Sequence, residues 1–333
     1  MACLCMSYDS PMTTTRNLAI SLLVLLAMAV HAHEDAIVQV APWEFHNSFW
    51  MSLHQSLMDD VMSKAPRHLE GATAEEQSAW NEAVEAYRKV APGRGDISFS
   101  QSMMATTYAL ARTADDAAEP PADALVAPIL KRAAAIYRAY GWSRDREANR
   151  FFIAYAAAMV REGGADLIRQ HETVYRTPWP KKVLVYITPA AGPYGAYTLN
   201  NAEMVVTTMS CRDEGYQGLR ALEMLMHESS HAVVDVNYGT VANAIAAAAK
   251  RHGVGVPRNL WHALLFETSG ELTRRYLAER GVTTFVPSSV DLFNRAWPQY
   301  RDAVQKYWRP YLGGAGTLED AVDKIVAEVG QPL

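Results

Sequence analysis

The chain has 333 residues, of which 50% are hydrophobic and 20% charged, and its formal net charge is −5. This composition is typical of a folded globular protein, and ordinary numbers of glycine (19) and proline (16) exclude a collagen-like or disordered chain. Because 31 basic residues stand against 36 acidic ones, we expect no nucleic acid among its partners. The length allows one large domain or two of ordinary size.

A single long apolar run, LAISLLVLLAMAV, lies at residues 18–30. It is shorter than the roughly 20 residues that a membrane-spanning helix needs. Arg16 precedes the run, and small residues lead out of it to Ala32. A basic start, an apolar middle and a small-residue exit predict a signal peptide over residues 1–32, cleaved after Ala32 or after Ala29. We therefore expect a periplasmic or secreted protein without a stable membrane anchor, with an uncleaved anchor as the alternative.

The three cysteines are too few for a disulfide scaffold. Cys3 and Cys5 belong to the predicted signal peptide, which begins at Met1 or at the alternative start Met12. Cys211 then has no partner within the mature chain. No base stands beside it in MSCRDEG, so we expect a packed thiol and not a catalytic one.

Most of the mature chain shows the apolar spacing of helices. Thr73 and Glu76 form a capping box at the start of the second of these segments. Helices are predicted at residues 43–64, 73–90, 99–113, 122–140 and 143–164, and again at 217–237, 240–251, 259–279, 288–308 and 317–329. The segments 181–190 and 196–209 are rich in β-branched and aromatic residues and predict strands.

These elements predict an α+β fold that is mainly α. We expect a helical, bundle-like region at residues 33–180 and a catalytic region with a small sheet at 181–333. The junction between them has no flexible linker, so we expect the two regions to pack as one unit. The oligomeric state does not follow from the sequence.

The motif that carries chemistry is His227-Glu228-Ser229-Ser230-His231, which has the pattern H-E-x-x-H. Residues four apart lie on one face of a helix, so both imidazoles can bind one ion. Zinc favours imidazole nitrogen and leaves a coordination position for water in catalytic sites. The carboxylate of Glu228 is suited to take a proton from that water. Burial of these three side chains in an apolar stretch without a cation would be costly, which favours a metal.

The segment HESSHAVVD resembles the active-site helix of thermolysin-like enzymes, which are gluzincin zinc metallopeptidases. This resemblance implies a zincin-like catalytic region, Zn²⁺ as cofactor and a peptide or protein as substrate. It also implies a third zinc ligand from a glutamate on a later helix. The resemblance covers two short helices. The M-E-N-type substrate-binding segment of related aminopeptidases is missing from this sequence, so the resemblance does not imply that the protein shares their specificity for the amino end of a peptide.

The predicted helix 259–279 offers Glu267 and Glu271 as this third ligand. Glu267 fits the E-x-x-x-D/E arrangement of the family. Glu271 falls inside the apolar stripe of the helix, where a carboxylate needs a cation. We therefore favour Glu271, with Glu267 as the alternative or as a supporting residue. An ion pair with Arg274 or Arg275 is the competing interpretation, and it suits Glu267 better than Glu271.

The expected reaction is hydrolysis of a peptide bond, with Glu228 as the general base. A tyrosine or histidine stabilises the oxyanion in gluzincins. Tyr197 and His262 are the residues we favour for this role, and Tyr194 and Tyr276 are further candidates. The segment AYTLNNAEMVV resembles the strand that precedes the active helix in such enzymes, whose edge can pair with an extended substrate.

Two other interpretations compete. A di-iron protein could use Glu228-x-x-His231, but that architecture needs a second such pair, which the chain lacks. A non-catalytic metal-binding or scaffold protein with a structural zinc would normally supply four protein ligands, often cysteines. The single mature cysteine does not favour that interpretation.

Overall fold

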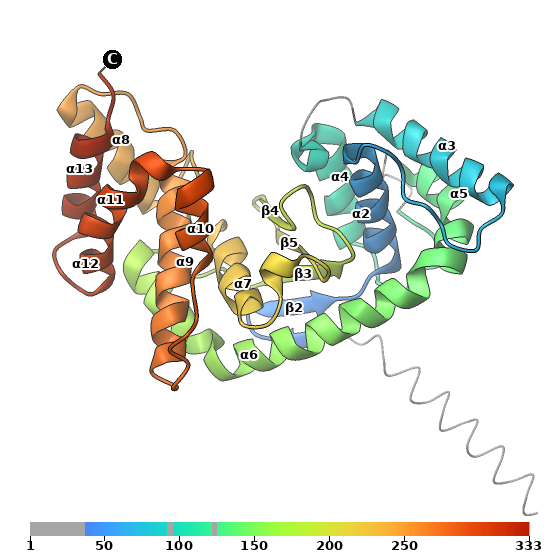
Figure 1. Ribbon diagram of the computed structural model, residues 1–333, viewed down its shortest axis with the longest axis horizontal. Helices are drawn as coiled ribbons and strands as arrows, with labels where there is room; N and C mark the ends of the chain where they lie inside the picture. The colour runs from blue at the N-terminus through green and yellow to red at the C-terminus, as the bar shows by residue number, and fades with distance from the viewer. Residues whose placement is uncertain (1–36, 92–95, 122–124, 333) are drawn as a thin grey trace, which may run out of the picture. The chain divides into compact units, whose positions relative to one another are not determined.

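The computed structural model describes residues 37–91, 96–121 and 125–332 of the chain. Residues Val38–Leu333 form one compact unit. It is mainly helical and contains one five-stranded mixed sheet, which confirms the predicted α+β class (Figure 1). The predicted signal peptide, with Cys3 and Cys5, lies outside the described residues.

The sheet has the strand order β1-β2-β3-β5-β4. Its strands are β1 (Val38–Val40), β2 (Trp43–His46), β3 (Val183–Thr188), β4 (Ala196–Asn200) and β5 (Val205–Ser210). The central pairs β2–β3 and β3–β5 are parallel, whereas β1 and β4 pair antiparallel at the two edges. The segment 196–209, expected as a strand, is therefore a hairpin that turns at residues 201–204.

The sheet crosses the boundary expected at residue 180. The predicted helix 43–64 is wrong for its first six residues, because Trp43–His46 form β2, which pairs with β3, and the helix begins at Phe49. Trp43 and Phe45 alternate with polar residues, and both are buried. This period of two belongs to a strand, and the helix starts only after the N-cap Ser48.

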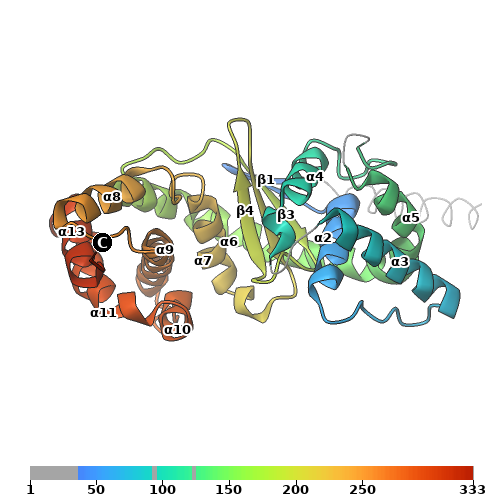
Figure 2. The same cartoon turned by 90° about the horizontal axis from the view of Figure 1, so that it is seen from above.

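The central strand β3 is buried on both faces, as expected for a strand with parallel neighbours. Leu184 and Tyr186 pack into one hydrophobic core, and Val183, Val185 and Ile187 pack into the other. Figure 2 shows the sheet edge-on, with α2–α5 on one side and α7–α13 on the other. The two layers of helices therefore cover opposite faces of one sheet.

The first helical layer contains α2 (Phe49–Met62), α3 (Ala74–Val90), η1 (Ile97–Phe99), α4 (Gln101–Ala111) and α5 (Ala127–Tyr137). The predicted capping box is confirmed: Thr73 accepts from the backbone of Glu76, and the Glu76 carboxylate accepts from the backbone of Thr73. A π-helical turn, η2 (Arg138–Trp142), leads from α5 directly into α6.

Helix α6 (Ser143–Tyr175) extends 33 residues and passes the glycines at which the prediction ended it. Tyr276 and Trp43 explain those glycines. A Cβ atom at Gly163 would lie 2.4 Å from the Tyr276 ring, and one at Gly164 would lie 2.6 Å from the Trp43 ring. The small residues therefore permit close packing within a continuous helix.

The second layer contains η3 (Glu214–Tyr216), α7 (Arg220–Ser230), α8 (Thr240–His252), α9 (Leu260–Ala278), α10 (Ser288–Arg295), η4 (Pro298–Tyr300), α11 (Arg301–Ala303), η5 (Val304–Trp308), α12 (Arg309–Leu312) and α13 (Leu318–Val329). Segment 288–308 is thus a series of short turns around Pro298, which breaks the single helix that we predicted. Within the described residues, no helix combines the length and the apolar character needed to cross a bilayer.

Candidate metal centre

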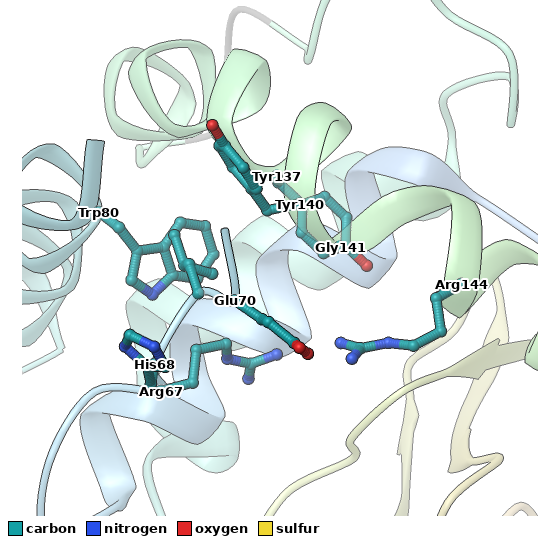
Figure 3. A pocket seen from close by; sticks show the side chains of 9 residues that line it. Arg67, His68, Glu70, Trp80, Tyr137, Tyr140, Gly141 and Arg144 are labelled. Carbon is teal, nitrogen blue, oxygen red and sulfur yellow. The ribbon is translucent and has the colours of Figure 1, made fainter. Parts of the chain in front are cut away.

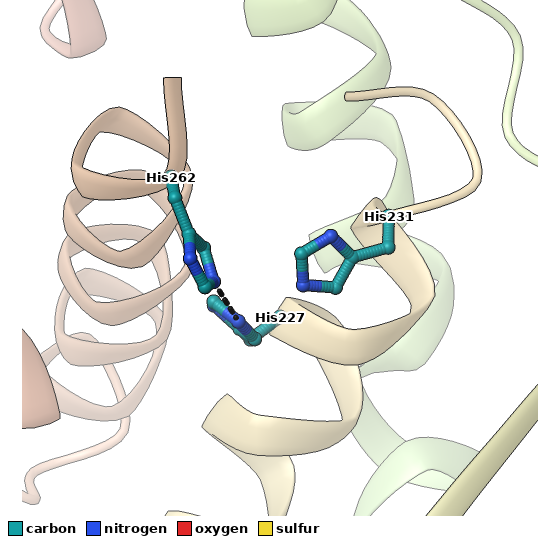
Figure 4. A group of neighbouring side chains, drawn as sticks. All are labelled: His227, His231 and His262. Carbon is teal, nitrogen blue, oxygen red and sulfur yellow. Dashed lines mark hydrogen bonds between the residues drawn. The ribbon is translucent and has the colours of Figure 1, made fainter. Parts of the chain in front are cut away.

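Three histidines from two helices face one another (Figure 4). His227 and His231 lie one turn apart at the end of α7, and His262 lies in the first turn of α9. Their ligand atoms all lie within 4.8 Å of one another. Within the described residues, this group is the one set of three or more such side chains with the geometry to hold a metal ion.

The spacing of the histidine nitrogens fits a metal better than a hydrogen bond. The Nε2 atoms of His227 and His262 are 3.3 Å apart. Two nitrogens that each lie about 2.0–2.1 Å from a tetrahedral zinc ion are about 3.3 Å apart. A hydrogen bond between imidazoles at this distance would be long. The distance between the two Nε2 atoms therefore matches the distance expected for two ligands of one zinc ion.

The protein keeps all three imidazoles neutral. Burial lowers the pKa of His231 to about 4. Burial, followed by the charge of His231, lowers the pKa of His262 to about 3. The pKa of His227 lies well below its usual value through burial and then the neighbouring histidines. Because a metal binds the neutral ring, these side chains are ready as ligands at neutral pH without losing a proton.

Contacts in the middle and at the end of the ligand-bearing part of α7 hold it in place. Trp43 donates from Nε1 to the hydroxyl of Ser229, 2.9 Å away, which joins the helix to β2. The carbonyl of His231 lies at the end of α7, where backbone carbonyls lack helical partners. It accepts from Nδ2 of Asn200 at 2.8 Å and from the Tyr238 hydroxyl at 2.7 Å. The helix thus ends at Ser230, before the predicted residue 237, and His231 is held as its cap.

Glu228 lies beside the histidine group and contacts the sheet. Its carboxylate is 4% exposed and accepts a hydrogen bond of 2.8 Å from Thr198 of the edge strand β4. Burial raises the pKa of Glu228 to about 8, although the Thr198 hydroxyl acts in the opposite direction. A buried carboxyl with a pKa near neutrality is suited to accept and release a proton.

Neither glutamate predicted as the third ligand belongs to the histidine group. Glu271 accepts from Arg274 and Arg275. Burial acts to raise the pKa of Glu271, but these two arginines hold it below its usual value. This pairing with Arg274 and Arg275 was expected for Glu267 and not for Glu271, which stays a predicted ligand outside the histidine group. The cation that a buried carboxylate requires is a guanidinium from the next turn of the same helix.

Glu267 is engaged in a different way. Its side chain is 1% exposed, and Oε1 accepts from Arg309 on α12. Burial raises the pKa of Glu267, and Arg309 partly opposes that effect. The side chain that lies beside His227 and His231 is His262, five residues earlier on the same helix. This group of three histidines differs from the two histidines and one glutamate that the gluzincin resemblance implied.

Of the four residues expected to stabilise an oxyanion, His262 lies in the histidine group. Tyr197 is buried on the face of β4 opposite Thr198, and its hydroxyl accepts from Gln55 at 2.6 Å. Tyr276 lies about 21 Å along α9 from His262, at 1.5 Å per residue, and Tyr194 is 70% exposed.

Aromatic rings surround the histidines. The ring of Phe266 lies 3.7 Å from that of His227, and Trp261 stacks on His262 at 4.8 Å. Trp297 packs against His262 from the segment before η4. These three rings therefore pack against the imidazoles of His227 and His262.

Comparison with models of known families, with curated proteins and with solved structures found no match to this chain.

Proposed function

We propose that this protein is a zinc-dependent hydrolase whose ion is held by His227, His231 and His262. The observation that carries the proposal is the convergence of three neutral imidazoles beside a buried carboxylate. Three protein ligands with an open fourth position are typical of catalytic zinc, whereas structural zinc usually has four. Imidazole nitrogens also suit other divalent transition metals, and zinc is the ion that the tetrahedral spacing favours.

The ion and Glu228 would have separate roles in the proposed hydrolysis. A divalent ion bound here would lower the pKa of water and polarise a carbonyl group. Glu228 accepts a proton at its carboxylate and passes it to the leaving group. Thr198 orients that carboxylate, and the aromatic rings of Trp261 and Phe266 pack against the histidines.

The surroundings favour an extended peptide as the substrate. Strand β4 is at the edge of the sheet, and Thr198 in its middle contacts Glu228. An edge strand can pair with an extended chain through its free backbone groups. A peptide paired with β4 would pass the carboxylate of Glu228. This arrangement agrees with the role that the gluzincin resemblance implied for the segment AYTLNNAEMVV.

The test measures metal and hydrolysis in the same samples. The full chain and a Glu228→Gln variant are purified, zinc is quantified, and cleavage of a fluorescently labelled casein is followed. We expect close to one zinc per chain in both proteins and a loss of hydrolysis of about 100-fold or more in the variant. Glu82→Gln, an exposed change on α3, is the matched control and should leave both quantities unchanged.

Three outcomes contradict the proposal. A chain that neither contains nor takes up a divalent ion would refute the metal centre. Equal hydrolysis by the Glu228→Gln variant would refute the role of the carboxylate. Stoichiometric zinc without hydrolysis of any peptide would favour the non-catalytic metal-binding protein instead.

A further inference from the structure

Away from the metal centre, the first helical layer contains a cavity of about 570 Å³ (Figure 3). Two rings in its wall, those of Trp80 and Tyr137, are 0% and 2% exposed and pack on each other. The side chains that a ligand would meet are mainly charged and exposed, such as Glu70 and Arg144. Such groups do not select a class of ligand. The contacts around His231 are more specific.

His231 is the metal ligand at which the helix stops. Helix α7 ends at Ser230, and His231 follows as its C-cap. In a continued helix, the carbonyl of His231 would accept from the amide of Asp235. That amide donates instead to the carbonyl of Tyr238, 3.4 Å away. Within the part of the chain that the structure describes, no backbone amide donates to the carbonyl of His231.

Two side chains occupy the place of the missing amide. Nδ2 of Asn200 donates to the carbonyl of His231 at 2.8 Å, and the hydroxyl of Tyr238 donates to it at 2.7 Å. Nδ2 of Asn200 also donates to the Tyr238 hydroxyl at 2.6 Å. An amide nitrogen has two hydrogens, so both are used here. The carbonyl is therefore held from two directions, by β4 and by the turn after α7.

The turn that follows α7 brings Tyr238 back to the metal ligand. The amide of Asn237 donates to Oδ1 of Asp235 at 2.9 Å, which closes the turn locally. Gly239 follows with a φ of 92°, a conformation that favours glycine. A Cβ atom there would lie 2.4 Å from the carbonyl oxygen of Val233. The local sequence therefore fixes the path on which Tyr238 returns.

Strand β4 supplies the other donor, and it also contacts the proposed general base. Thr198 and Asn200 are two residues apart, so their side chains lie on one face of the strand. Thr198 donates to the carboxylate of Glu228, and Asn200 donates to the carbonyl of His231. The strand is paired with β5 over its whole length. One paired strand thus supports both the carboxylate and a ligand of the metal centre.

We propose that Asn200 and Tyr238 are positioning residues of the metal centre. They hold the backbone of His231 and so direct its imidazole toward those of His227 and His262 (Figure 4). This inference rests on the proposed function, because it concerns the same ion. Replacement of residues that hold a metal ligand in place typically lowers metal affinity by about 10- to 100-fold.

The experiment measures the zinc affinity of the full chain by competition with a chelating dye. Asn200→Ala and Tyr238→Phe each remove one donor to the carbonyl. Each variant should bind zinc at least about tenfold more weakly than the natural sequence. Tyr140→Phe is the matched control, because it removes a hydroxyl that donates to Glu76 at 2.7 Å on the other side of the sheet. Asn243→Ala, an exposed change on α8, is the second control. Both controls should keep the natural affinity.

Two further measurements separate positioning from a loss of folding. Thermal melting of the metal-free proteins should show that the variants fold. The visible absorption of the cobalt-loaded protein reports the arrangement of the ligands. This spectrum should change in Asn200→Ala and in Tyr238→Phe and stay the same in the controls. Tyr238→Phe keeps the ring and removes one oxygen, so it tests the proposal even if Asn200→Ala does not fold.

The outcomes distinguish this inference from the proposed function. Natural zinc affinity in Tyr238→Phe, or a cobalt spectrum that neither substitution changes, would overturn the positioning role and leave the zinc site intact. A natural chain that takes up no divalent ion would overturn the proposed function and this inference with it.

Discussion

His227 and His262 face each other through their Nε2 atoms at 3.3 Å, although 35 residues separate them in the chain. The first is fixed by α7 and the second by the first turn of α9, and Phe266 packs against both rings. The third member of the histidine group is therefore set by how two helices pack. A spacing of residues along one helix sets only the first two.

The first prediction concerns this third ligand. His262→Ala should lower zinc affinity by at least about 100-fold, because it removes one of three ligands, and even residues that only support a ligand change affinity 10- to 100-fold. Glu271→Gln and Glu267→Gln should keep zinc near one per chain. Metal content after dialysis against a weak chelator measures this. Zinc lost from Glu271→Gln and retained by His262→Ala would restore the glutamate assignment.

The sequence was sufficient for the part of this site that depends on local spacing. His227, Glu228 and His231 share one helix turn, and their convergence follows from helical geometry alone. His262 appeared among the candidate residues, but its role depends on how the segment from Ala232 to Asn259 returns α9 to α7. The spacing of apolar residues does not predict the path of this segment.

Glu271 lies three and four residues before Arg274 and Arg275, a spacing that allows these ion pairs on one helix. Two other contacts of the site depend on packing. Thr198, which contacts Glu228, becomes recognisable only when β4 is known to be the edge strand beside α7. The same holds for Trp43, whose bond to Ser229 requires that β2 be a strand and not a helix.

The second prediction concerns the thiol of Cys211. It is buried, and burial raises its pKa to about 11, so it stays protonated at pH 8. Because the thiolate is the reactive form, the native protein should react with Ellman's reagent at least about tenfold more slowly than the protein in guanidinium chloride. Cys211→Ser should retain full hydrolysis. Rapid labelling of the native protein, or loss of hydrolysis in the variant, would contradict the interpretation of Cys211 as a packed, non-catalytic thiol.

The third prediction concerns stability in acid. His54 is fully buried between Tyr87 and Thr107, and burial lowers its pKa to about 3. Below the usual value of 6.5, the unfolded chain binds a proton at this residue that the folded chain does not. The free energy of unfolding should therefore fall as the pH drops from 6.5 toward 3, by at most about 1.4 kcal/mol per pH unit from this group.

Urea unfolding of the metal-free protein at several pH values measures this slope. His54→Gln should be less stable at pH 7 because it disturbs a buried network, but its slope below pH 6.5 should be smaller. His68→Gln, an exposed change, should keep the slope of the natural sequence. Parallel slopes for all three proteins would show that other groups control the acid response.

The last prediction concerns Thr198, whose hydroxyl donates to the Glu228 carboxylate at 2.8 Å. This bond favours the ionised carboxylate and so lowers a pKa that burial alone would place higher. Thr198→Val keeps the shape of the side chain and removes the donor, so the pKa of Glu228 should rise. The acidic limb of the kcat/KM profile should then move to higher pH, with a loss of about tenfold at neutral pH, since a bond to a charged group contributes about 1.5–3 kcal/mol.

Thr198→Ser restores the donor and should restore the profile. A merely structural role would lower activity equally at all pH values and would not distinguish serine from valine, and that result would remove Thr198 from the mechanism.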